Sequence, residues 1–173
     1  LHFARNILPL VRKVRPDARL HIVGSSPPRE VRALGRDPAI SVTGYVPDIR
    51  EAIGRATLAV CPVTVNVGIQ NKVLEAMAMG LPVVCSKEGF TGLAAVPGRD
   101  LLVANNAVEF AEAVCRLLDN AGLCRQLGEA GRHYVETHHR WDDAARRLEA
   151  KYLEGASRRA THPLHELSPA SLV

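Results

Sequence analysis

The sequence contains few aromatic residues: they make up 4% of its 173 residues, and only one is tryptophan. Proteins that bind single-stranded nucleic acid stack bases on aromatic side chains set among basic ones, and no such interleaving occurs here. We therefore expect no nucleic acid as a partner. The apolar residues, 47% of the chain, are mainly Leu, Val and Ala, which is typical of parallel sheets covered by helices.

The chain also lacks any long hydrophobic run. No stretch approaches the ~20 apolar residues that cross a bilayer, and residues 1–6 lack the charged and then apolar layout of a secretory signal peptide. The first residue is not Met, so we expect that a preceding part of the protein is missing. These features predict a cytoplasmic protein.

Cysteine motifs that bind metal are absent as well. The four cysteines form no Cys-x-x-Cys pair and have no His at zinc-ligand spacing. We therefore expect no metal site and predict free buried thiols, two in strands and two in helices, as in a reducing cytoplasm. They are Cys61, Cys85, Cys115 and Cys124.

The positive charge is concentrated at the start of the chain. Residues 1–36 hold eight Lys or Arg against Asp17 and Glu30, a net of +6, so the remainder of this chain of net charge +4 sums to −2. A basic first quarter suits contact with anionic lipid headgroups or with the phosphates of a nucleotide. The alternative is a solvated helix surface.

Apolar runs bounded by turns alternate with longer periodic stretches, the pattern of parallel βαβ units. This pattern predicts an α/β fold, a Rossmann-like doubly wound parallel sheet that closes with helices. We assign residues 1–154 to one domain and 155–173 to a flexible C-terminal tail. Helices are predicted over 2–14, 28–35, 48–56, 69–79, 90–95, 106–119, 121–137 and 141–154, and strands over 19–23, 40–43, 57–61, 82–86 and 101–103.

Four loops follow predicted strands, at residues 24–26, 44–47, 62–70 and 86–92. Parallel α/β sheets bind ligands outside the carboxyl ends of their strands, so we expect these loops to line one edge. Taken singly, each Gly-rich or Pro-rich loop could simply end a strand.

Residues 68–84, GIQNKVLEAMAMGLPVV, read as a loop, a helix and a buried strand. Gly68 permits a tight turn, and Gly80 is predicted at the left-handed position that ends a helix. Glu75 lies between Leu74 and Ala76, so we expect it near the wall of a cleft, where its carboxylate can accept two hydrogen bonds from a diol such as ribose. The alternative is an exposed structural Glu, since Glu is mostly exposed.

This stretch resembles the donor-binding helix of the retaining glycosyltransferases of group 1, also called family 4. The resemblance is carried by Gly68, Lys72, Leu74, Glu75, Ala76, Met77, Ala78, Gly80, Pro82, Val83 and Val84, and it extends more weakly from Arg5 to about Glu154. It implies the C-terminal half of a GT-B fold, without its first strand. It also implies a nucleotide-diphosphate sugar as donor, with no cofactor and no metal.

The resemblance assigns donor contacts to individual residues. The strand that ends at Gly24 is similar to one whose terminal Gly lets the backbone approach the donor. Gly44, Tyr45 and Val46 are similar to the element that holds the nucleobase, through backbone hydrogen bonds and aliphatic packing. The motif itself, with Gly68 at its start, places Asn71 and Lys72 at the diphosphate and Glu75 at the ribose hydroxyls, and a helix start also favours anions physically.

The chain departs from the family in three places. Many members of the family carry two Glu residues in this region. The first reaches the donor sugar and lies eight positions before the second, which corresponds to Glu75. In this sequence, Val67 occupies the position of the first Glu. In the family, the C-terminal domain opens with a strand and a loop whose basic or polar residues hold the diphosphate. These two elements would precede Leu1. The N-terminal, acceptor-binding domain is absent too, so catalytic residues are not assigned, and we expect the piece alone to be inactive.

The region around Trp141 resembles the family's closing helix, which runs toward the first domain. The alternative for Trp141 is a core anchor.

Two other functions remain open from the sequence. A nucleotide-sugar 2-epimerase shares the fold, but it is expected to carry catalytic His, Asp and Glu in cleft loops that here are rich in Val, Asn and Gly. A non-catalytic α/β interaction module would leave Glu75 on the surface. We favour sugar transfer to a polysaccharide, lipid or other glycoconjugate, with peripheral contact at the inner face of the membrane by the full-length protein.

Overall fold

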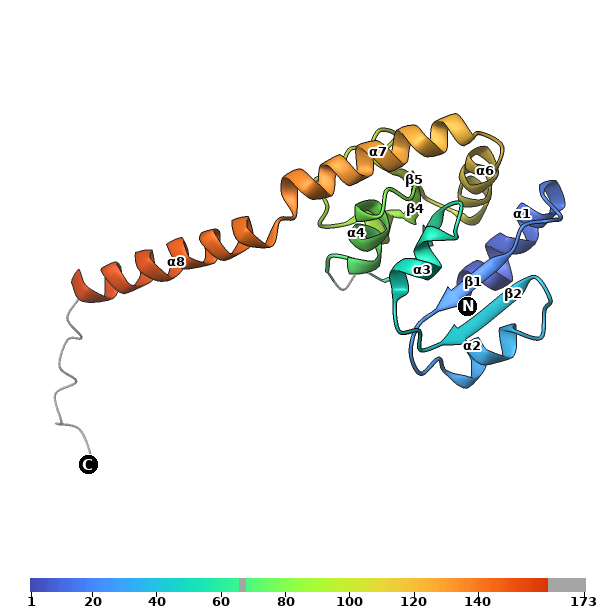
Figure 1. Ribbon diagram of the computed structural model, residues 1–173, viewed down its shortest axis with the longest axis horizontal. Helices are drawn as coiled ribbons and strands as arrows, with labels where there is room; N and C mark the ends of the chain where they lie inside the picture. Colours follow the sequence, from blue (N-terminus) through green and yellow to red (C-terminus); the bar gives the residue numbers. More distant parts are fainter. Residues whose placement is uncertain (66–67, 162–173) are drawn as a thin grey trace, which may run out of the picture. The chain divides into compact units, whose positions relative to one another are not determined.

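The computed structural model describes residues 1–65 and 68–161. Val67 and the tail beyond residue 161 lie outside the described residues. The chain forms two units, Leu1–Thr137 and a second that starts at His138. The elements are η1 (Phe3–Ile7), α1 (Leu8–Val14), β1 (Leu20–Val23), α2 (Arg29–Leu34), β2 (Ile40–Gly44), α3 (Ile49–Gly54), β3 (Ala59–Cys61), α4 (Asn71–Ala78), β4 (Val83–Ser86), α5 (Lys87–Phe90), β5 (Leu102–Ala104), α6 (Ala107–Leu118), α7 (Ala121–His138) and α8 (Trp141–Thr161) (Figure 1).

Among the described residues, five strands form two parallel sheets. β1 pairs with β2, and β4 lies between β3 and β5. In register, Leu20 lies opposite Ile40, and Val84 lies opposite both Val60 and Leu102. The predicted α/β class and the parallel strands are confirmed. The predicted single sheet, however, is divided in two, because no described strand joins β1 to β3.

Helix α4 ends at Gly80, as the sequence predicts. Gly80 has a φ of +72°, its N–H donates to the carbonyl of Met77 (2.9 Å), and the N–H of Leu81 donates to the carbonyl of Ala76 (3.0 Å). The two bonds form a Schellman motif, which satisfies carbonyl groups that a helix end leaves free. The motif turns the chain into β4 just ahead of Pro82.

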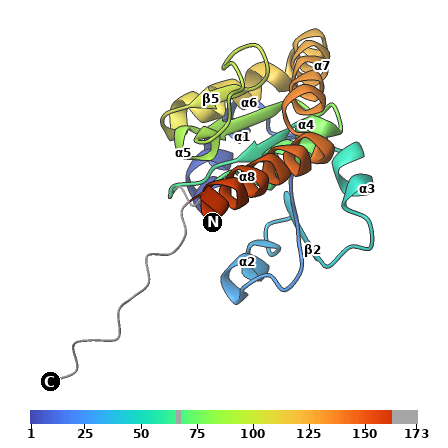
Figure 2. The ribbon, with the colours of Figure 1, turned by 90° about the vertical axis from the view of Figure 1, so that its left-hand side faces the viewer.

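The core of the first unit has one cluster on each face of β4, because successive side chains of a strand point to opposite faces. Val84 packs in the cluster with residues of η1, α1 and α6, whereas Val83 and Cys85 pack with residues of α4. Figure 1 shows α6 and α4 on opposite sides of β4, and Figure 2 shows α1 beside α6. The rings of Phe3 and Phe110 meet edge to face, with centroids 5.7 Å apart.

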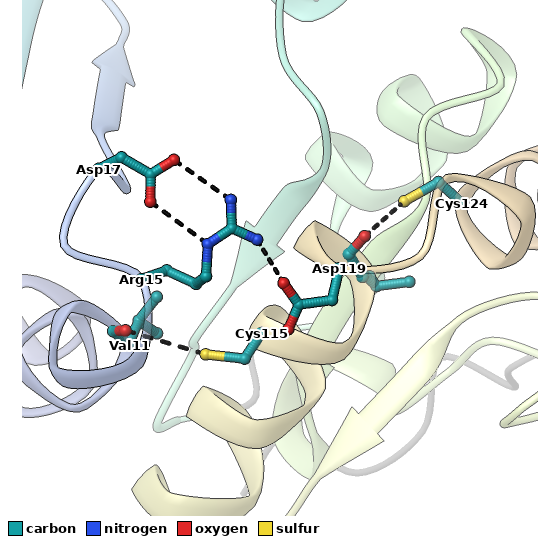
Figure 3. A network of polar contacts seen from close by, with 7 residues as sticks. Val11, Arg15, Asp17, Cys115, Asp119 and Cys124 are labelled. Atoms are coloured by element: carbon teal, nitrogen blue, oxygen red, sulfur yellow. Dashed lines mark hydrogen bonds and ion pairs between the residues drawn. The ribbon is translucent and has the colours of Figure 1, made fainter.

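A polar network fastens the end of α1 to the end of α6 (Figure 3). The guanidinium of Arg15 pairs with Asp119 and with Asp17, and its hydrogen bond lowers the pKa of Asp17 below the ordinary value. The thiol of Cys115 lies 3.9 Å from the carbonyl oxygen of Val11. Arg15 and Asp17 lie between α1 and β1, so these contacts hold that connection against the end of α6.

Three predicted features differ in the structure. The short helix expected over 90–95 is α5 at residues 87–90, because the Ser86 side chain accepts a hydrogen bond from the N–H of Gly89 and starts the helix earlier. The last helix extends to Thr161, so residues 155–161 of the predicted tail are helical. Trp141 is 89% exposed, so the reading of this side chain as a core anchor is wrong.

The four cysteines lie in the predicted kinds of element, but the prediction that all four are buried is wrong for Cys124. Three thiols are free and buried, and Cys124 is free and half-buried, two of the four being in strands and two in helices. None of the helices within the described ranges combines the length and the apolar character needed to span a bilayer.

Candidate functional site

The first unit contains a cavity of about 630 Å³ between β1 and β3. Its walls come from both strands and from α1, α3, α4 and α6, and most of the lining side chains are apolar. Among the lining residues, the sequence assigned Lys72 and Glu75 to donor binding, and they lie one turn apart on α4. The structure therefore brings the charged part of the motif to one wall of one cavity.

The loop before α4 places this helix start at the carboxyl end of β3. Gly68 has a φ of +99°, a conformation that favours glycine. Gln70, which is buried, donates from its side-chain nitrogen to the carbonyl oxygen of Gly68 (3.1 Å) and forms the N-cap of α4. Asn71 is the first residue of the helix and is exposed. The free backbone N–H groups at the start of α4 and the helix dipole make this end of the helix suitable for an anion.

Lys72 is exposed and lines the cavity. Burial raises the pKa of the Cys61 thiol above its ordinary value, and the positive charge of Lys72 opposes that rise. Cys61 is the last residue of β3 and lines the same cavity as Lys72.

Glu75 lies at the exposed side of the same helix. Its neighbours Val73, Ala76 and Met77 are buried in the core, whereas Glu75 is exposed and lines the cavity. The expected place at a cleft wall is found, although the carboxylate is open to solvent rather than enclosed by apolar groups. Its contact with a ribose stays a prediction.

The predicted base-binding residues form a separate group at the ends of β1 and β2. The N–H of Gly24 donates to the carbonyl of Gly44 (3.2 Å), and the Tyr45 side chain is 76% exposed. Gly24, Gly44, Tyr45 and Val46 are not among the described residues that line the cavity, which reaches Val23 at its near end. Their role in binding a base stays a prediction.

A second cavity, of about 210 Å³, lies at the carboxyl ends of β3, β4 and β5. Its polar lining was not singled out as a site by the sequence, although Ser86 and Glu88 fall in the loop 86–92 that was expected at this edge. Several of these groups already hold the backbone: Ser86 donates to the carbonyl of Val63 (2.5 Å), and Asn106 caps α6. The polar residues are His2, Thr64, Ser86, Glu88, Asn105 and Asn106.

Within the described part of the chain, no three His, Cys, Asp or Glu side chains gather closely enough to bind a metal ion. The charged groups on the cavity wall are donors and acceptors for hydrogen bonds and ion pairs. A cation and a carboxylate one helical turn apart, beside a helix start, can bind a ligand that carries both an anionic group and vicinal hydroxyls.

Residues 1–120 match the family described as glycosyl transferases group 1. The chain belongs to this family. A relative in Streptomyces coelicolor, named an exopolysaccharide phosphotransferase, is 32% identical over 153 residues, which cover 83% of this chain and 16% of that protein. A GDP-mannose-dependent phosphatidylinositol monomannoside mannosyltransferase of Corynebacterium glutamicum is 29% identical over 153 residues, covering 82% of this chain and 40% of that protein. The chain thus spans less than half the length of these curated relatives.

Three solved structures show the same fold. The C-terminal domain of a group 1 glycosyltransferase from Francisella tularensis superposes with a TM-score of 0.67 at 21% identity, covering 81% of this chain and 78% of that one. Sucrose-phosphate synthase from Thermosynechococcus elongatus gives 0.73 at 24% identity, over 90% of this chain and 43% of that one. An Anabaena protein, HepE, solved with UDP, gives 0.73 at 15% identity, over 86% and 44%. The fold is that of the C-terminal domain of GT-B glycosyltransferases.

Proposed function

We propose that this chain is the donor-binding half of a retaining glycosyltransferase, which transfers a sugar from a nucleotide-diphosphate sugar to a polysaccharide, lipid or other glycoconjugate. The observation that carries the proposal is that Lys72 and Glu75 lie together on the cavity wall near the start of α4. The family match supports the reaction class. The name of the GDP-mannose-dependent mannosyltransferase supports this class of donor and a lipid acceptor, and the name of the exopolysaccharide enzyme supports a polysaccharide acceptor.

In this proposal each half of the donor has its own contacts. Glu75 accepts hydrogen bonds from the two ribose hydroxyls, and the backbone after Gly44 holds the base. Lys72 and the free N–H groups at the start of α4 face the diphosphate. Transfer releases a nucleoside diphosphate, so a fixed cation and oriented N–H groups stabilise the charge that develops on the leaving group, without a metal.

The acceptor lies outside this chain in the proposal. Two reactants must be held in near-attack geometry for transfer, an effect worth several kcal/mol in general, and the acceptor is positioned by a separate N-terminal domain. We infer a cytoplasmic enzyme with peripheral contact at the inner face of the membrane. Exposed arginines on and just after α2, Arg29, Arg32 and Arg36, suit anionic headgroups.

A transfer assay tests the proposal directly. A panel of nucleotide-diphosphate sugars and lipid or saccharide acceptors is offered to the 173-residue chain and to the longer protein that contains it. We expect nucleotide binding by both and transfer only by the longer protein. Transfer by the 173-residue chain alone would overturn the division into two halves, and absence of nucleotide binding in both would overturn the proposed donor site.

A further inference from the structure

The cavity of about 210 Å³ at the carboxyl ends of β3, β4 and β5, here called the small cavity, combines polar groups with an apolar wall. The apolar wall includes Pro62, Val63 and Phe110. On the polar side, Glu88 is half-buried and Thr64 is exposed. Within the part of the chain that the structure describes, the Glu88 carboxylate and the Thr64 hydroxyl take part in no hydrogen bond or ion pair. Both groups are therefore available to a ligand.

The chemistry of the small cavity suits an uncharged ligand with several hydroxyl groups. The Asn105 side-chain nitrogen donates to Glu109 (2.9 Å), so its amide oxygen is left as an acceptor. Carboxylate, amide and hydroxyl oxygens accept hydrogen bonds from hydroxyl groups, whereas the charge of Glu88 repels a phosphate. A volume of about 210 Å³ lies below the roughly 300 to 1,000 Å³ of pockets for drug-sized ligands. The small cavity therefore suits a single sugar ring and not a whole nucleotide.

Close backbone contacts hold the segment that carries Glu88 beside the approach to α4. A β-carbon at Gly89 would lie 2.9 Å from the carbonyl oxygen of Cys61, the last residue of β3. A β-carbon at Gly92 would lie 3.2 Å from the Cγ1 atom of Ile69, two residues before α4. The segment over residues 89–92 thus packs against both ends of the loop that connects β3 to α4. Glu88 is thereby fixed near the helix start that the proposed function assigns to the diphosphate.

The direction of the donor along the sheet edge leads to the same cavity. In the proposed function the base lies at the backbone after Gly44, at the end of β2, and the diphosphate lies at the start of α4. β1 pairs with β2, whereas β4 lies between β3 and β5. The nucleoside and the sugar are attached to opposite ends of the diphosphate. A donor whose base extends toward β2 therefore directs its sugar toward the ends of β4 and β5, where the small cavity lies.

From this geometry we infer that the small cavity binds the sugar of the donor, an uncharged monosaccharide unit, and that Glu88 is its main polar contact. The Glu88 carboxylate accepts hydrogen bonds from sugar hydroxyls, and Thr64 and Asn105 contact the remaining ones. The apolar wall packs against the C–H groups of the ring. The inference rests on the proposed nucleotide-sugar donor and adds to it the residues that recognise the sugar.

The test compares nucleoside diphosphates with the corresponding nucleotide sugars. UDP, UDP-glucose, GDP and GDP-mannose are titrated by calorimetry into the wild type and into Glu88→Ala and Glu88→Gln. Lys87→Ala is the matched control, because Lys87 is the exposed neighbour of Glu88 on α5 and lies outside the described lining of the small cavity. Amide NMR spectra show whether Thr64 and Asn105 respond to the nucleotide sugar. Thermal unfolding shows that each variant is folded.

We expect Glu88→Ala to weaken binding of the nucleotide sugar about tenfold or more, and that of the matching nucleoside diphosphate by less than about twofold. Glu88→Gln should lose less, because its amide oxygen can still accept a hydrogen bond. The Thr64 and Asn105 amides should shift with the nucleotide sugar only, and Lys87→Ala should change none of these values.

Three results would contradict the inference. Equal losses for the nucleoside diphosphate and its nucleotide sugar would show that Glu88 does not act on the sugar. Unchanged affinities in Glu88→Ala, with nucleotides still bound, would overturn the sugar site alone and leave the proposed donor site standing. Absence of binding by all four ligands in the wild type would overturn the proposed function and this inference with it.

Discussion

Gly128 of α7 packs directly against the carbonyl oxygen of Gly80: a β-carbon at residue 128 would lie 2.1 Å from that oxygen. The backbone of α7 thus touches the turn that ends α4 and starts β4. The atom in the way belongs to the backbone, so it cannot move aside as a flexible side chain could. Any side chain at residue 128 must shift α7 away from the site-bearing helix.

We expect Gly128→Ala to lower the free energy of unfolding by about 3 kcal/mol or more, because overpacking of a backbone contact forces the two elements apart. Urea unfolding measures the loss. Gly54→Ala is the control, since a β-carbon there meets no atom within 4 Å and a helical Gly→Ala change is neutral or stabilising. Equal effects of the two substitutions would contradict the close contact.

Asp100 is a buried carboxylate that holds the turn before β5. It is 2% exposed and accepts hydrogen bonds from the N–H of Val96 (2.7 Å) and from the guanidinium of Arg99 (2.7 and 2.9 Å). We expect Asp100→Ala to cost about 3 kcal/mol of stability, because the N–H of Val96, in a part-buried hydrogen bond, and the guanidinium of Arg99 both lose their partner. Asp100→Asn should cost less, since an amide oxygen can still accept. Thermal and urea unfolding check both, with the exposed Glu129→Ala as control.

The buried thiol of Cys85 should make the stability of the fold depend on pH in the alkaline range. Burial raises the pKa of its thiol from 9.0 to about 12, so the folded state keeps a proton that the unfolded state releases. The contribution of this thiol to the free energy of unfolding is fully present below pH 9 and is lost as the pH rises from 9 toward 12. The free energy of unfolding then falls by up to about 1.4 kcal/mol per pH unit. In reducing buffer, Cys85→Ala should flatten this decline. An unchanged slope would show that the thiol ionises normally in the folded protein.

Glu75→Ala should weaken UDP or GDP binding by about 1.5 to 3 kcal/mol, the range for a charged hydrogen-bond acceptor. The fold should survive, because Glu75 is exposed and packs in neither core cluster. Titration calorimetry measures the change, and Glu112→Ala, an exposed Glu on α6, is the matched control. Equal affinities of the wild type and Glu75→Ala would remove this carboxylate from the site.

Lys72→Ala should discriminate between ligands. If the ammonium meets the diphosphate, affinity for a nucleoside diphosphate falls much more than affinity for the bare nucleoside, because only the former presents the charge. The comparison is made by titrating UDP and uridine into the same variant. A similar loss for both ligands would limit Lys72 to a structural role at the start of α4.

Much of the local structure follows from the sequence. The motif helix was predicted over 69–79 and spans 71–78, and Gly80 takes the expected left-handed conformation, because caps and helix propensity act within a few residues. The spacing of Lys72 and Glu75 likewise places them on one face of α4. Their common cavity is the part of the site that local patterns could indicate.

Contacts between distant segments could not be predicted in this way. The approach of Gly128 to Gly80 and the pairing of Arg15 with Asp119 join residues that no periodic pattern links. The cavity of about 630 Å³ arises because β1 and β3 lie apart, and an arrangement of sheets depends on all their packing partners together. The base-binding group was placed by resemblance, and the cavity lining ends at Val23, one residue before it.

The fastening of α1 to α6 has a consequence for how the protein is made. Arg15 and Asp119 are 104 residues apart in sequence, and translation proceeds at ~5–20 residues per second. The apolar side of η1 and α1 therefore leaves the ribosome roughly 5 to 20 s before its covering helix exists. During that interval Phe3, Ile7 and Val11, all buried in the finished protein, are exposed and can bind chaperones or a second chain. The segment formed by η1 and α1 is therefore a site at which misfolding can start during synthesis.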